Sequence, residues 1–179
     1  MAPASLGGMR RTSFEGWPCS IARTADLLGD GWTLLVLREV FSGQSRFDGF
    51  VETLGIARNT LGDRLRRLVD AGLLERRPYQ SDPVRYDYLP TERGRDLFGV
   101  LAAMNTWGDR WLGGDDGVPV ALRHETCGSD LRARVVCAAC GEDLESADVT
   151  SRPGPGYPVR LLERPDVRRR FGLPVHPGA

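Results

Sequence analysis

Lysine is missing from this chain of 179 residues, and all 24 of its basic residues are arginine. Because there are also 24 acidic residues, the formal net charge is zero, and the chain as a whole has no charge excess that would attract nucleic acid. An all-arginine composition is typical of a GC-rich genome. A single arginine therefore says little about DNA contact, and only arginines placed within a motif count.

Long apolar runs and histidines are also scarce. The longest run of large aliphatic residues, Leu34 to Leu37, is far shorter than the ~20 residues that a membrane-spanning helix needs. The first residues lack the apolar core of a signal peptide, so we expect a cytoplasmic protein with no membrane partner. Both histidines lie in the C-terminal third, and no Ser-His-Asp triad or carboxylate pair is convincing. The sequence therefore predicts no enzyme.

Two stretches between Ser45 and Gly72 carry apolar residues at three- and four-residue spacing, which indicates two helices joined by a tight turn. Ser45 can cap the first helix and Gly55 ends it, whereas the second begins near Arg58 and ends at Gly72. The apolar residues are Phe47, Phe50, Val51 and Leu54 in the first helix and Leu61, Leu65, Leu68 and Ala71 in the second. This order predicts a helix-turn-helix motif.

The opposite side of the second helix is polar, which suits a recognition helix that enters the major groove of DNA. Arginine can donate two hydrogen bonds to guanine, asparagine can bond adenine, and both can also contact phosphates. The predicted DNA-binding residues of this helix are Arg58, Asn59, Thr60, Asp63, Arg64 and Arg67.

Beyond Gly72 the pattern changes to that of two strands, at 73–79 and 85–89, with a turn at 80–83. The span from Arg58 to Arg85 contains seven arginines and four acids, so this part of a neutral chain has three excess positive charges. The order of elements favours a winged helix over a merely solvated amphipathic helix and hairpin. The wing residues that we expect to hold DNA phosphates are Arg76, Arg77 and Arg85.

Helices are predicted on both sides of this motif. Two supporting helices, at 21–28 and 33–41, precede it, and Thr91 caps a long helix that follows the wing. An apolar stripe on such a helix is usually core, but two tryptophans at the end of a small domain exceed what a monomer needs and favour a dimer interface. The stripe comprises Leu97, Val100, Leu101, Met104, Trp107, Trp111 and Leu112, of which Met104, Trp107 and Trp111 are the predicted dimer contacts.

From roughly Cys19 to Leu112 the chain resembles the HxlR-type transcriptional regulators of bacteria and archaea. The resemblance implies a winged helix-turn-helix fold and a homodimer, formed by the terminal helices, that presents two recognition helices to an operator in double-stranded DNA. The sequence departs from the family pattern at Ser20, where proline is usual, and at Pro90. The matching segments are Cys19 to Ala22, Gly31 to Glu39, Arg46 to Asp48, Asn59 to Leu68, Ala71 to Leu73, Pro83 to Tyr88 and Leu89 to Gly94.

Two matched motifs follow a predicted linker at 113–121, one ending in Cys127-Gly128 and the other in Cys140-Gly141. Each motif has two ligating side chains three positions apart and then a glycine, which is the spacing of a zinc knuckle. One histidine and three cysteines would close a tetrahedral site, so we expect structural zinc within a ribbon-like hairpin at 122–149, with 131–136 as a short hairpin between the halves. The predicted ligands are His124, Cys127, Cys137 and Cys140. Alternatively, the last two cysteines form a redox pair, or the ribbon folds without metal.

Cys19 stands apart from these motifs, just before the first predicted helix. In several members of the resembled family the corresponding cysteine is implicated in sensing oxidants or electrophiles, which makes Cys19 a candidate redox sensor. A helix N-terminus and Arg23 would lower the pKa of its thiol and favour reactivity, whereas Ile21 nearby favours a buried, inert thiol.

The leading prediction is an α+β, mostly α, protein whose residues 19–112 bind DNA and dimerise. Residues 1–18 form an arm expected to be flexible, and the proline-rich tail at 150–179 is expected to be disordered or loosely packed on the dimer. The alternatives are a regulator switched by oxidation of Cys19 and a zinc-ribbon interaction module with a vestigial winged helix. The residues identify no effector.

Overall fold

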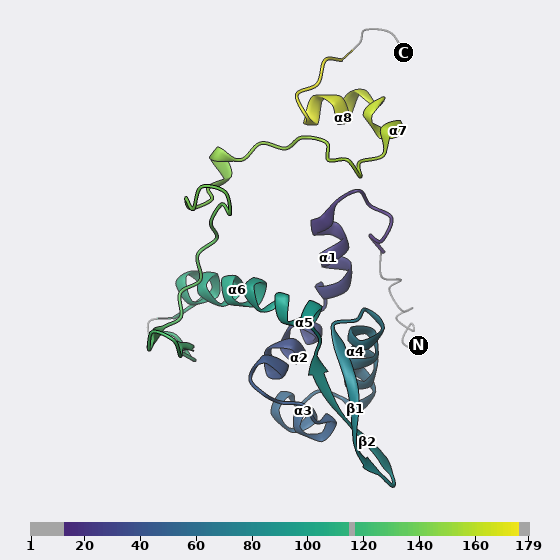
Figure 1. Cartoon of the computed structure of the whole chain (residues 1–179), viewed down its shortest axis with the longest axis vertical. Helices are drawn as coiled ribbons and strands as arrows, with labels where there is room; N and C mark the ends of the chain where they lie inside the picture. Colours follow the sequence, from purple (N-terminus) through teal and green to yellow (C-terminus); the bar gives the residue numbers. More distant parts are fainter. Residues whose placement is uncertain (1–12, 115–116, 176–179) are drawn as a thin grey trace, which may run out of the picture. The chain divides into compact units, whose positions relative to one another are not determined.

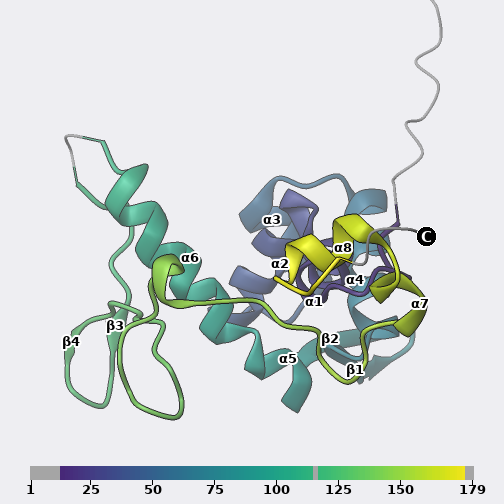
Figure 2. The same ribbon diagram turned by 90° about the horizontal axis from the view of Figure 1, so that it is seen from above.

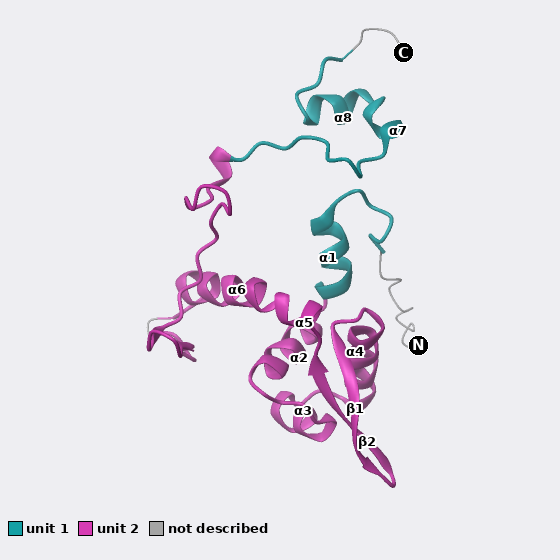
Figure 3. Cartoon of the chain, in the orientation of Figure 1, with its two compact units in different colours: residues 1–29, 149–179 teal, residues 30–148 magenta. Residues whose placement is uncertain are grey.

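The computed structural model describes residues 13–114 and 117–175, so most of the predicted N-terminal arm lies outside the described residues. The chain divides into two compact units, one made of residues 30–148 and the other of residues 1–29 together with 149–179 (Figure 3). Within the described residues, the helices are too short and too polar to cross a membrane.

The larger unit begins with the winged helix. Helices α2 (Gly31–Phe41), α3 (Phe47–Leu54) and α4 (Arg58–Asp70) precede an antiparallel hairpin of strands β1 (Leu74–Ser81) and β2 (Val84–Pro90). Figure 1 shows this hairpin projecting beyond the ends of α3 and α4. The predicted helix-turn-helix and wing are confirmed, with strand boundaries shifted by one residue or two.

The core of this unit lies where α4 packs against its neighbours. Leu61, Leu65 and Leu68, which the spacing of α4 places on one side, are buried, and so is Phe50 of α3. Three further core side chains belong to α2, namely Val36, Leu37 and Val40. The others are Ile56 in the turn before α4, Leu73 and Leu74 at the start of the wing, and Ala102 in the second helix after the wing.

The ends of the helices follow from local chemistry. Gly72, at φ 67°, ends α4 with its N–H bonded to the carbonyl of Val69, while the N–H of Leu73 bonds the carbonyl of Leu68. Gly55 likewise ends α3 at φ 61°. The predicted cap at Ser45 is wrong, because α3 begins after Arg46 without a side-chain cap and the Ser45 hydroxyl bonds a distant residue instead.

After the wing, Thr91 caps the next helix as predicted, accepting a 3.0 Å hydrogen bond from the N–H of Gly94. The expected single long helix is instead two helices, α5 (Glu92–Asp96) and α6 (Phe98–Trp111), which meet at Leu97. A Cβ atom on Gly94 would lie 2.0 Å from the carbonyl oxygen of Leu73, so only glycine allows α5 to lie this close to the chain before β1.

Two small hairpins follow α6, carrying the two predicted knuckles (Figure 2). The first pairs β3 (Arg123–His124) with β4 (Ser129–Asp130), and the second is marked by a bridge between Val136 and Asp143. The expected hairpin at 131–136 is therefore wrong, because this stretch lies between the hairpins and each predicted ligand pair has a hairpin of its own. A short 3-10 helix, η1 (Ser146–Asp148), ends this unit.

The smaller unit contains α1 (Ser20–Leu28), which confirms the first predicted helix, and two short helices, α7 (Val159–Leu162) and α8 (Pro165–Arg170). The rings of Tyr157 and Phe171 meet edge to face, with centroids 5.1 Å apart. The described part of the tail thus contains two short helices, whereas its proline content predicts disorder or loose packing.

Candidate nucleic-acid interface

The N-terminus of α4 is the centre of the candidate interface. Arg58 and Asn59 lie in its first turn, and both are exposed. The N-cap residue is Ala57, which makes no side-chain cap hydrogen bond, so the first N–H groups of the helix have no capping oxygen. Because these groups and the helix dipole attract anions, this end of α4 is suited to a DNA phosphate as well as to base edges.

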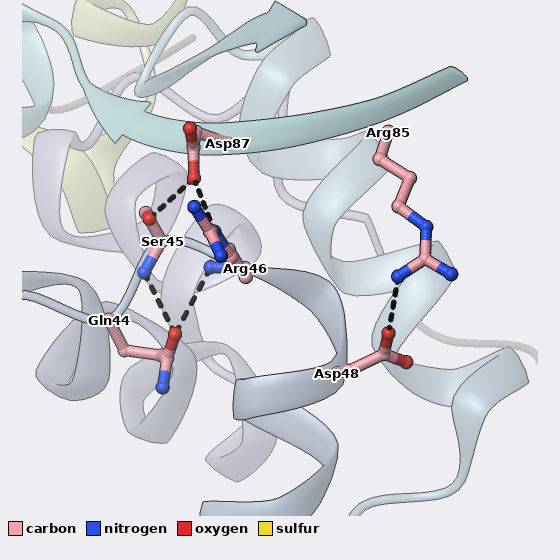
Figure 4. Close-up of polar contacts among 6 residues, drawn as sticks. All are labelled: Gln44, Ser45, Arg46, Asp48, Arg85 and Asp87. Atoms are coloured by element: carbon pink, nitrogen blue, oxygen red, sulfur yellow. Dashed lines mark hydrogen bonds and ion pairs between the residues drawn. The ribbon is translucent and has the colours of Figure 1, made fainter. Parts of the chain in front are cut away.

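Asp48 of α3 joins the recognition helix to the wing. One of its carboxylate oxygens lies 2.7 Å from Nη2 of Arg58, and the other lies 3.5 Å from Nη1 of Arg85 on β2. Figure 4 shows the side chain of Arg85 reaching across from the strand to Asp48. The three residues line a hollow of 320 Å³ between α3, the start of α4 and the wing. Sequence reasoning missed Asp48, because its partners lie 10 and 37 residues away.

A second set of contacts fixes the wing to the start of α3 (Figure 4). The Ser45 hydroxyl donates to a carboxylate oxygen of Asp87 at 2.7 Å, and Nε of Arg46 lies 3.6 Å from the same oxygen. The side-chain oxygen of Gln44 accepts the N–H groups of Ser45 and Arg46, each at 3.1 Å. The N–H of Tyr88 also bonds the carbonyl of Ser45 at 2.8 Å. The wing therefore keeps a defined position beside the helix-turn-helix.

Arg64 has a different position from the one that its helix face suggested. Its guanidinium lies 2.6 Å from the carboxylate of Asp30, and both side chains are only 21% exposed. Position 64 lies three residues after Leu61 and four before Leu68, so it borders the apolar stripe and reaches back toward α2. In the structure Arg64 therefore joins α4 to the start of α2, and its predicted contact with DNA stays a prediction.

Asp30 serves both as the partner of Arg64 and as the N-cap of α2, where it accepts the N–H of Thr33 at 3.2 Å. Burial by itself would raise the pKa of this carboxyl. The hydrogen bond from Arg64, the N–H of Thr33 and the attraction of the arginine charge outweigh burial and hold the pKa of Asp30 below its ordinary value of 3.8.

The other predicted contact residues keep positions consistent with an interface. Asp63 is exposed and pairs with Arg66 at 2.9 Å, whereas Thr60 and Arg67 are half-buried. In the wing, Arg76 lies over the ring of Tyr86 and Arg77 pairs with Glu75 at 3.0 Å. The three wing arginines, Arg76, Arg77 and Arg85, are all exposed.

An apolar stripe runs along the exposed side of α6. Val100, Met104, Trp107 and Trp111 are 45%, 48%, 58% and 60% exposed. Their spacing of four, three and four residues places all of them on one side of the helix, away from the buried Ala102. The monomer therefore leaves uncovered the aromatic surface that the sequence assigned to a dimer contact.

The four predicted zinc ligands come together only in pairs. Nδ1 of His124 lies 3.3 Å from Sγ of Cys127, and Cys137 lies in one turn with Cys140. Among the described residues, no three histidines, cysteines or acids gather at a point where they could hold a metal. Hydrogen bonds lower the pKa of the Cys127 thiol to about 7. The largest effect comes from the N–H of Ser129, and smaller ones come from the His124 side chain and the Ser129 hydroxyl. The N–H groups of Cys140 and Ala139 lower the pKa of the Cys137 thiol.

Cys19 is half-buried at the N-cap of α1, where its side chain makes no cap hydrogen bond. Its predicted role as a redox sensor stays a prediction.

Known proteins are similar to this chain in sequence and in fold. Residues 27–116 match the model of the HxlR-like helix-turn-helix family. An uncharacterised HTH-type transcriptional regulator of Mycobacterium tuberculosis, Rv3095, is 47% identical over 148 residues, which are 83% of this chain and 92% of that protein.

Two solved structures are also similar. PA1607, a candidate transcription factor, is 34% identical with a TM-score of 0.72, and the match covers 80% of this chain and all (100%) of that one. PA1374 of Pseudomonas aeruginosa, also a candidate transcription factor, is 40% identical with a TM-score of 0.55, over 77% of this chain and 94% of that one. With its winged helix, its basic recognition face and these relatives, the chain belongs to the HxlR-like helix-turn-helix family of transcriptional regulators.

Proposed function

We propose that this regulator binds a two-fold symmetric operator as a homodimer, with α4 in the major groove and the wing on the DNA backbone. The observation that carries the proposal is the position of Arg58, Asn59 and Arg85. The first two lie at the uncapped start of α4, and the third lies on the wing across a shared hollow. A duplex that follows this surface meets base-reading side chains and phosphate-binding side chains together.

The two groups of side chains have different tasks. Asn59 is exposed beside Arg58, and its amide can form two hydrogen bonds with an adenine edge. Arg76, Arg77 and Arg85 project from a hairpin beside the helix-turn-helix, where an extended guanidinium meets phosphate rather than a base. We therefore infer a protein that binds DNA without catalysis and acts in the cytoplasm.

The second copy is the partner that suits the α6 stripe. Met104, Trp107 and Trp111 form a continuous apolar side of one helix, and an identical helix offers the same side in return. Two-fold pairing through α6 would present two copies of α4 to half-sites about one helical turn of DNA apart.

The test begins with selection of preferred duplexes from a random pool by the full chain. In the selected operator we expect two inverted half-sites. Asn59→Ala should weaken binding to it by about 1 to 3 kcal/mol and relax the preference at particular base pairs. Arg77→Ala should weaken binding to selected and random duplexes alike and make the salt dependence less steep, because one phosphate contact is lost.

Thermal melting of each variant checks that its fold is intact, and fluorescence anisotropy measures its affinity at several salt concentrations. An equal loss from Asn59→Ala on the selected operator and on random DNA would contradict the base-reading role. A single half-site, bound equally well by one chain, would contradict the two-fold arrangement.

A further inference from the structure

The two knuckle motifs of the C-terminal segment form the same turn. In each, the glycine N–H bonds the carbonyl of the first predicted ligand at 2.8 Å, Gly128 to His124 in one and Gly141 to Cys137 in the other. Both glycines have positive φ angles, 73° and 79°. A residue with a side chain rarely adopts this conformation, so the glycines are required by the turn and not by composition. The two motifs, 124–128 and 137–141, therefore adopt the same backbone turn.

Each turn also stands at the tip of a hairpin. The first hairpin is closed by the pairing of Arg123 with Asp130, and the second by hydrogen bonds from Cys137 to Glu142 and from Leu144 to Val135. The Arg134–Asp143 ion pair supports the second stem.

The stretch that carries the hairpins lacks a core of its own. From Gly117 to Thr150, a range described throughout, every side chain is exposed or half-buried. One hydrogen bond from the N–H of Ala133 to the Thr106 hydroxyl ties this stretch to α6. Small segments that bury so little apolar surface are usually held by disulfides or by metal, and all four cysteines of the chain are free thiols in the structure.

We propose that one Zn²⁺ ion per chain joins the two hairpin tips through His124, Cys127, Cys137 and Cys140. In the structure the two pairs are separate, and the stretch at 131–135 that connects the hairpins has no regular structure. Nine residues lie between Cys127 and Cys137, which is enough chain to bring the two tips together. Zinc binding therefore also brings the two hairpin tips into contact with one ion.

The donor set defines the ion and its role. Three sulfur atoms and one imidazole nitrogen in tetrahedral geometry favour zinc over magnesium or calcium, which require oxygen ligands. Binding displaces the protons of those thiols that are still protonated and leaves a site with formal charge −1, from Zn²⁺, three thiolates and a neutral imidazole. Because the four protein ligands fill the tetrahedron, no position remains for water, and the site is structural.

The test uses the full chain purified with reductant and without chelator. Elemental analysis should find one zinc per chain, and cobalt in its place should give the visible spectrum of a tetrahedral ion with thiolate ligands. Arg132 and Arg134 lie in the connecting stretch and are exposed, so they provide trypsin sites. Zinc should slow cleavage there, and a chelator should restore it.

Variants separate this site from adventitious zinc. His124→Ala and Cys140→Ser should each lose the metal and the protection from trypsin, whereas Cys19→Ser removes a thiol outside the ribbon and should keep both. Because the winged helix has a core of its own, DNA binding reports whether each variant has folded. Metal-free wild-type protein whose cleavage is unchanged by added zinc would overturn the proposal. A disulfide between Cys137 and Cys140, or full zinc content in both ligand variants, would do the same.

Discussion

Asp48 pairs with two arginines of the candidate nucleic-acid interface. It contacts Arg58 of α4 and Arg85 of the wing, two of the arginines that we propose to contact DNA. All three side chains are about half exposed or more, and exposed ion pairs contribute little to folding. The main effect of Asp48 is therefore expected on binding, because it competes with DNA for two guanidinium groups.

Asp48→Asn should tighten binding to random duplex DNA and make the salt dependence steeper, since two arginines then meet phosphate without a competing anion. Anisotropy titrations of a random duplex at several salt concentrations measure both effects. Glu75→Gln is the matched control, because it removes a carboxylate that pairs with one wing arginine, Arg77. It should change the affinity less. An equal change of affinity in both variants would contradict a specific role of Asp48.

Asp30 acts on stability and not on binding. It caps α2 and holds Arg64, and its pKa lies below the ordinary 3.8. A carboxyl whose pKa is depressed by folding contributes stability above its unfolded pKa and loses that contribution as the pH falls through the folded value. The benefit of Asp30 should therefore be complete near neutral pH and should disappear below about pH 4.

Asp30→Ala should lower the free energy of unfolding at neutral pH by about 1 to 2 kcal/mol, because the cap is lost and Arg64 stays partly buried without its partner. Urea denaturation at a series of pH values measures the difference from the wild type, which should shrink as the solution is acidified. Asp30→Asn keeps the cap and loses the charge, so it should cost less. A difference that stays constant down to pH ~3 would contradict the role assigned to the ion pair.

At the scale of the element, α6 has one side buried in the core and one side exposed. Ala102 faces the core, and the stripe from Val100 to Trp111 faces outward. Buried aromatic side chains contribute most of the free energy at many interfaces, so the two tryptophans are the expected anchors of a dimer. In the proposed dimer, both tryptophans would be buried against the second copy of α6.

Trp107→Arg should convert the dimer to a monomer, because it places a charge in the middle of an apolar contact. Sedimentation gives the mass, and anisotropy should show weaker binding to a two-half-site operator with little change on one half-site. Leu112→Arg is the control. The spacing assigns Leu112 to the stripe, but in the structure it is the C-cap of α6, is 74% exposed and lies outside the row formed by Val100, Met104, Trp107 and Trp111. If Trp107→Arg leaves the mass and operator affinity unchanged, the stripe is ordinary surface.

At the scale of the whole molecule, the net charge is zero, but the basic residues and the buried apolar residues are both unevenly distributed along the chain. The arginines between Arg58 and Arg85 outnumber the acids there by three, and the surrounding chain supplies the compensating acids. Most of the buried side chains belong to α2, α3, α4 and the start of the wing. The winged helix can therefore fold on its own core, whereas the hairpins after α6 depend on the metal that we propose.

The sequence by itself determined the elements whose causes are local. The stripe of Leu61, Leu65 and Leu68 predicts α4 because helical spacing is a property of neighbouring residues, and Gly55 and Gly72 end their helices through their own backbone conformation. The strands and turn of the wing and the residue types at the start of α4 follow from the same short-range information. These features were sufficient to identify the family.

Tertiary structure decided which polar side chains are available. Ser45 was a sound local cap, but Asp87 lies within hydrogen-bond distance and takes its hydroxyl. The sequence pattern predicts a DNA contact for Arg64, yet Asp30, 34 residues away, holds its guanidinium against the start of α2. These contacts depend on residues far apart in the chain, and a pattern of spacing carries no information about which distant charge will come within hydrogen-bond distance once the helices have packed.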